Sequence, residues 1–146
     1  GAATIMHIPV IVAGILEGPV VGAFVGLLFG LFTLPIFGDP RVVIPARLVI
    51  GGGAWLAFRA ARFLLKNRVS DRAVYALAGG FAGLIGTVIN TIGTLSLAVV
   101  FGYFPIRGPE GAVAIGVFHG TPEALVATVV VAGLAAILSK RLARRR

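Results

Sequence analysis

The chain has 146 residues, of which 58% are hydrophobic and 12% are charged, and its formal net charge is +8. Soluble domains carry about 25% charged residues, so this composition excludes a water-soluble protein and indicates one transmembrane domain over residues 1–146. The absence of cysteine excludes disulfides and thiolate metal sites. Alternating ten-residue strands, the mark of a membrane barrel, do not occur. The expected fold is therefore all-α, a polytopic membrane helical bundle.

The first apolar segment, residues 5–16, is too short to cross a bilayer with ease, because a span needs about 20 residues. The triplet Glu17-Gly18-Pro19 then interrupts it. Two interpretations stay open: one kinked helix over residues 5–33, or a short helix that turns at Gly18 and returns. Proline is tolerated at the first position of a new helix, which favours the hairpin. The hairpin places His7 at the outer membrane surface.

Prolines and glycines divide the remainder of the chain. Residues 35–45 contain three prolines and are predicted as a loop, and residues 102–112 form a second loop rich in glycine and proline. Tyr103 and Phe104 in that loop are typical of an interfacial aromatic belt. The five expected helices cover about residues 5–16, 19–34, 46–65, 72–101 and 113–139.

Positive charge is concentrated at two places that flank apolar runs. Ten of the 13 lysines and arginines belong to these two clusters: Arg59, Arg62, Lys66, Arg68 and Arg72, then Lys140, Arg141, Arg144, Arg145 and Arg146. Cytoplasmic loops of membrane proteins carry such an excess, whereas this placement argues against nucleic-acid binding. We expect a multi-pass protein of a prokaryotic plasma membrane whose C-terminus is cytoplasmic.

Small residues recur at helical spacing in the second segment. Gly22, Gly26 and Gly30 fall on one helix face, where the missing side chains let another backbone approach closely. Two roles remain open for this face: packing inside the bundle, or a sliding surface against a coupling subunit.

Polar side chains inside the spans are costly, and they usually mark a functional site. Most of those in this chain are expected in the outer half, where a pocket open to the outside would need them. The candidate substrate-binding residues are His7, Arg47, Trp55, Asn90, Thr91, His119 and Glu123.

Each candidate also has an ordinary structural explanation. Arg47, expected at the start of its span, either snorkels to the surface or pairs with a substrate carboxylate through its forked donors. Asn90 and Thr91 either join helices by hydrogen bonds or contact a ligand. Glu123 follows a proline near a helix N-terminus, where the helix dipole alone favours a carboxylate. Trp55 is expected to pack, or to form a wall of the pocket.

Three motifs resemble those of a known family. TIMHIPVIVAGILEGPVVGAFVGLLFGLF, VINTIGTL and GTPEALVA are similar to segments of the S components of energy-coupling factor (ECF) vitamin transporters. The resemblance covers essentially the whole chain and implies a six-helix bundle, of which five helices are present. The first helix, with the Ala-x-x-x-Ala motif that docks the coupling subunit in this family, is expected to be missing.

The resemblance implies a substrate-capture subunit that takes a water-soluble vitamin from outside. Its implied partners are a membrane coupling (T) subunit and two ATPase subunits. The pantothenate and riboflavin branches look closest, and pantothenate is the favoured substrate.

Other classes of function stay as alternatives. No Ser-His-Asp set, HExxH, P-loop or paired-carboxylate motif occurs in the chain, so we expect no enzyme activity, no cofactor and no metal site. A small membrane enzyme would need such a motif, and an ion-coupled secondary transporter would work without ATPase partners.

Overall fold

The computed structural model describes residues 5–144, and it is helical throughout its regular elements. Four of the helices are long and apolar enough to cross a membrane, which confirms the predicted polytopic all-α bundle. Arg145 and Arg146 of the second basic cluster lie outside the described residues. The helices are α1 (Ile8–Glu17), α2 (Pro19–Phe37), α3 (Pro40–Leu65), α4 (Asp71–Val100), α5 (Ala112–Ile137) and α6 (Ser139–Arg144).

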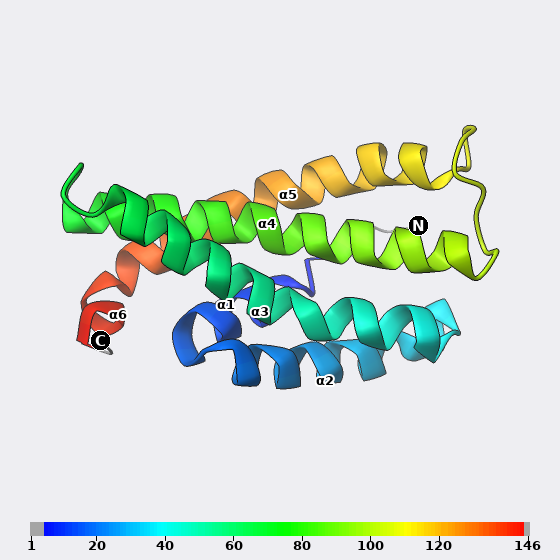
Figure 1. The fold of residues 1–146 in the computed structure, drawn as a ribbon, viewed down its shortest axis with the longest axis horizontal. Coiled ribbons are helices and arrows are strands. Elements are labelled where there is room, and N and C mark those ends of the chain that lie inside the picture. The colour runs from blue at the N-terminus through cyan, green and yellow to red at the C-terminus, as the bar shows by residue number, and fades with distance from the viewer. Residues whose placement is uncertain (1–4, 145–146) are drawn as a thin grey trace.

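The four long helices run side by side along the longest axis of the molecule, and α1 packs among them (Figure 1). We call the end that carries the Gly18 turn, the turn at residues 66–70 and α6 the basic end. The opposite end carries the turn at residues 38–39 and the loop at residues 101–111, and we call it the loop end. The described residues of the two Lys/Arg clusters therefore lie at one end of the bundle, although they are far apart in the sequence (Figure 1).

The chain reverses at Gly18, as in the hairpin interpretation of the N-terminal segment. Gly18 has a φ of 99°, which L-residues with a side chain rarely adopt, and Pro19 opens α2 at a position that needs no backbone donor. Helix α1 has ten residues and is only about 15 Å long. It therefore begins inside the bundle rather than at its loop end.

Glycines bring the backbones of α1, α2 and α3 into close contact. A Cβ atom on Gly22 would lie 2.9 Å from the Cα atoms of both Gly14 and Gly51. One on Gly26 would overlap the carbonyl group of Arg47, and one on Gly30 would lie 3.5 Å from the Cα atom of Ile44. The stripe on α2 is thus used for packing inside the bundle, one of its two predicted roles.

The loop expected over residues 35–45 is much shorter in the structure. Gly38 and Asp39 alone separate α2 from α3, while Pro35 and Pro45 lie inside helices. Gly38 ends α2 in the left-handed conformation, and the Asp39 side chain caps α3 by accepting a hydrogen bond from the Arg41 amide at 2.8 Å. Membrane helices tolerate internal proline, so three prolines were a poor signal for a loop.

The glycine contacts predict a measurable difference between two single substitutions. We expect Gly22→Ala to lower the free energy of unfolding by about 1–3 kcal/mol, because the added methyl group meets backbone atoms that cannot move aside. Gly133→Ala is the control, since no atom lies within 4 Å of its added Cβ. Thermal unfolding of both variants in detergent measures the effect, and equal melting temperatures would contradict this packing.

Candidate functional site

A polar cluster lies inside the loop-end half of the bundle, and it is built around Arg47. This residue is 3% exposed, and its Nη1 group donates a hydrogen bond to the Thr94 hydroxyl. Thr94 in turn donates to the backbone oxygen of Asn90 at 2.7 Å. The Arg47 guanidinium also lies over the ring of Phe29, 4.8 Å from its centre, and it interacts electrostatically with Glu123. Side chains from α2, α3, α4 and α5 therefore converge on one buried cation.

The start of α3 explains why Arg47 is buried. From the sequence we expected Arg47 at the beginning of its span, but in the structure α3 begins at Pro40. Arg47 therefore lies about two turns inside the helix, beyond easy reach of the surface. Gly30 on α2 lies beside it, and a Cβ there would be in ordinary van der Waals contact with the Cβ and Cγ atoms of Arg47 at 3.7 Å.

Two buried polar atoms of the predicted site residues have no hydrogen-bond partner among the described residues. They are the Oδ1 atom of Asn90, a residue that is 6% exposed, and the Nδ1 atom of His119 on α5. An unsatisfied buried polar group costs about 1–3 kcal/mol, so native proteins keep few of them. The amide oxygen can accept a hydrogen bond from a bound molecule, and the ring nitrogen can accept or donate one according to its tautomer.

His7 lies deeper than the hairpin interpretation expected. It is fully buried, and its Nε2 atom is 2.9 Å from the hydroxyl of Thr87. Thr87 is near the middle of α4, about 20 Å along the axis from Val100 at the loop end. The expectation of an outer-surface histidine is therefore wrong, because the ten-residue α1 does not reach the loop end.

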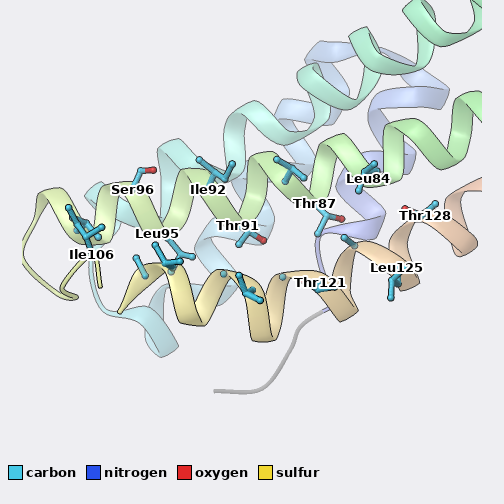
Figure 2. A pocket seen from close by; sticks show the side chains of 18 residues that line it. Leu84, Thr87, Thr91, Ile92, Leu95, Ser96, Ile106, Thr121, Leu125 and Thr128 are labelled. Atoms are coloured by element: carbon cyan, nitrogen blue, oxygen red, sulfur yellow. The ribbon is translucent and has the colours of Figure 1, made fainter. Parts of the chain in front are cut away.

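A groove with a volume of about 830 Å³ lies between α4 and α5 (Figure 2). Apolar side chains such as Ile92, Leu95 and Leu125 form most of its wall, and Thr91 and Thr121 contribute hydroxyl groups. Ile106 from the loop at residues 101–111 borders it as well (Figure 2). Arg47, Asn90, Thr94 and Glu123 are not among the residues that line the groove.

Thr91 and Trp55 therefore stand apart from the other candidates. Thr91 faces the groove and lies close to Gly120, where an added Cβ would be 3.1 Å from its methyl group. Trp55 is two turns further along α3 than Arg47 and carries the guanidinium of Arg59 over its ring at 4.9 Å. The structure brings together Arg47, Asn90 and Glu123, but it gives Trp55 no contact with them.

Sequence reasoning missed Thr94, Thr87 and Phe29. A signal for the two threonines was present, because Thr87, Asn90, Thr91 and Thr94 follow the spacing of one helix face in an otherwise apolar span. Phe29 had no such signal, since ten phenylalanines are scattered along the chain.

At the loop end, Asp39 joins the turn at residues 38–39 to the loop at residues 101–111. Its carboxylate accepts hydrogen bonds from the Arg41 side chain and, at 2.8 Å, from the Tyr103 hydroxyl. The Arg41 guanidinium also covers the ring of Phe101 at 4.5 Å. The bonds from Arg41 and Tyr103 hold the pKa of Asp39 well below its usual range, and the bond to Asp39 raises the pKa of Tyr103. Tyr103 thus anchors the loop in addition to its expected place at the interface.

Four helices long and apolar enough to cross a membrane, with a charged and an amide side chain buried among them, are typical of a multi-pass membrane protein. A family model described as ECF transporter, substrate-specific component, matches residues 2–139. The chain belongs to this family, so it is a transporter subunit that captures a substrate at the membrane. Comparisons with curated proteins and with solved structures gave no match.

The hydrogen bonds of Asp39 predict that the stability of the anchored loop is constant at intermediate pH and falls at both low and high pH. Because the pKa of Asp39 is lowered in the folded state, its ionised carboxylate stabilises the anchored loop above the ordinary carboxyl pKa of about 4. This contribution is lost as pH falls through the pKa that Asp39 has in the folded protein. A raised Tyr103 pKa stabilises it below about pH 10, and this contribution is lost as pH rises through the folded value.

The test uses a fluorophore on Glu110→Cys, which would be the only cysteine in the chain. We expect constant anisotropy between about pH 5 and 9. Adding Tyr103→Phe should lower the anisotropy at every pH and remove the alkaline transition. Adding Arg107→Gln, a change in the same loop outside the Asp39 network, is the control. An unchanged anisotropy in the Tyr103→Phe protein would contradict the anchor.

Proposed function

We propose that this chain is the substrate-capture subunit of an ECF-type importer and that it binds pantothenate in the loop-end half of the bundle. The observation that carries the proposal is the Arg47 cluster, with the unsatisfied Asn90 amide beside it. Family membership supports the capture role, while the substrate rests on the chemistry of these side chains.

The chemistry of pantothenate suits the cluster. Its carboxylate would bind the Arg47 guanidinium, whose five donors allow contact with a ligand and with Thr94 at once. Its hydroxyl or amide N–H groups would donate to the Asn90 amide oxygen. Glu123 balances the charge of Arg47 when no substrate is present, and His119 and His7 would border the ligand on the α5 and α1 sides.

The orientation in the membrane follows from charge. The basic end carries cations at the turn after α3 and on α6, which favours a cytoplasmic location for this end and for the C-terminus. The Arg47 cluster would then lie in the outer half, where it can receive a vitamin from outside the cell.

The groove between α4 and α5 supports riboflavin as a second candidate. Its volume of about 830 Å³ and its apolar wall suit a flat ring system better than a small anion. The Thr91 and Thr121 hydroxyls would then bind the polar edge of the ring.

Binding titrations distinguish the two substrates. We expect the purified protein to bind pantothenate saturably, and Asn90→Ala to weaken binding about tenfold or more, because a hydrogen bond at a buried site is lost. Arg47→Lys should weaken it similarly, since lysine keeps the charge but loses the fork. Trp55→Phe is the control and should change affinity less than twofold.

Isothermal titration calorimetry with pantothenate and with riboflavin gives the affinities. If both site variants bound pantothenate like the wild-type protein, the cluster would not be the substrate site. If the protein bound riboflavin but not pantothenate, and Thr91→Val weakened this binding, the groove between α4 and α5 would be the substrate-binding site.

The proposed partners are a membrane coupling subunit and two ATPase subunits. We expect uptake of labelled pantothenate by cells to require co-expression of such a module and to cease when its ATPase subunits carry inactivating substitutions. Uptake that persists with those substitutions and stops on collapse of an ion gradient would instead indicate a secondary transporter.

A further inference from the structure

The basic end of α3 carries three cations on aromatic rings. Arg59 lies over Trp55 at 4.9 Å from the ring centre, and Lys66 lies over Phe63 at 5.0 Å. Arg62 lies over Tyr75 of α4 at 4.6 Å, and Tyr75 in turn packs against Phe58 with ring centres 6.2 Å apart. Such contacts restrict where the cationic groups can point.

These side chains form one stripe on the helix. Trp55, Arg59, Arg62 and Lys66 are spaced by four, three and four residues, so they share a face of α3. Trp55 and Arg62 are half-buried, and Arg59 and Lys66 are exposed, so the stripe reaches the surface of the bundle. We call these four residues the cationic stripe.

Acidic side chains do not neutralise the cationic stripe. Among residues 5–144, two ion pairs have N–O distances within 4.0 Å. One joins Arg41 to Asp39 at the loop end, and the other joins Arg141 of α6 to Glu17 of α1. Asp71 is the one carboxylate between residues 59 and 72, and it lies in the first turn of α4, where the helix dipole favours it. The positive charge of the stripe is therefore available to an external anion.

The depth of the cationic stripe matches the edge of a bilayer. Arg59 lies about 28 Å along the helix axis from Pro40, and the hydrocarbon core of a bilayer is about 30 Å thick. Trp55 lies one turn further in, at the level where indole rings border the headgroups. Arg59 and Arg62 are three residues apart on the same face of α3, and guanidinium groups bind phosphate through charge-assisted hydrogen bonds.

We propose that the cationic stripe binds the headgroup of an anionic phospholipid, with its phosphate between Arg59 and Arg62 and its acyl chains along the exposed apolar side chains of α3. Leu56, which is 62% exposed, and Val49, which is 54% exposed, offer such a surface on the membrane side of the arginines. The lipid would hold the basic end of α3 at a fixed depth in the bilayer.

Trp55 is the only tryptophan in the chain, so its fluorescence reports on the site directly. The detergent-purified protein is titrated with short-chain phosphatidylglycerol, with phosphatidylcholine of the same chain length, and with inorganic phosphate. We expect a saturable change with phosphatidylglycerol alone, weakened at least tenfold when salt rises from 0.05 to 0.5 M. An equal response to phosphatidylcholine or to phosphate would overturn the proposal.

Two double variants with the same loss of charge test the position of the site. We expect Arg59→Gln with Arg62→Gln to weaken phosphatidylglycerol binding at least tenfold. Lys140→Gln with Arg144→Gln, at the same end of the bundle but on α6, should weaken it less than twofold. Equal losses in the two would mean that diffuse charge attracts the lipid, and the localised site would be wrong. If the variant with Arg59→Gln and Arg62→Gln fails to fold, the comparison of the three titrants on the wild-type protein still decides whether an anionic headgroup is bound.

Discussion

The close approach of three helix backbones at glycine is the constraint on which the remainder of the structure depends. Gly14, Gly22 and Gly51 allow α1, α2 and α3 to touch with no side chains between them. Further along α2, Gly26 and Gly30 face Arg47, so the same stripe that packs the helices also lies against the residue at the centre of the polar cluster. In a lipid environment, where helix association depends on van der Waals contact, such an approach supplies both stability and position. Packing and site formation are thus one feature of α2.

Composition was enough to predict the all-α membrane bundle, because 58% hydrophobic residues leave too little polar surface for water. Gly18-Pro19 correctly favoured a turn, since Gly18 adopts the positive φ between the two helices and Pro19 begins α2. The prolines at 35, 40 and 45 misled, because only Pro40 marks a helix start and the other two are absorbed into helices. Local sequence cannot distinguish these cases, as neighbouring helices and side chains compensate the lost hydrogen bonds.

For the candidate site, the sequence identified the polar residues correctly by type, but it did not predict how deep in the bundle each of them lies. Arg47, Asn90 and Glu123 were identifiable as polar groups in apolar spans, and they do converge. The depth of His7 depended on the length of α1 and on its pairing with Thr87, which is 80 residues away in the chain. Thr94 could have been found from the spacing on α4, whereas the role of Phe29 arises only from packing between α2 and α3.

The two ends of the bundle differ in how their charges are compensated, and α3 connects them. At the loop end, Arg41 is paired with Asp39, so an approaching anion meets a nearly neutral surface. Arg47 lies inside, where a low dielectric strengthens electrostatic interactions and where its interaction with Glu123 limits the cost of its burial. At the basic end, Arg59 and Arg62 rest on aromatic rings, without a carboxylate within 4.0 Å among the described residues. One helix therefore carries a cation that interacts with a carboxylate in its loop-end half, and cations without a carboxylate within 4.0 Å among the described residues at its basic end.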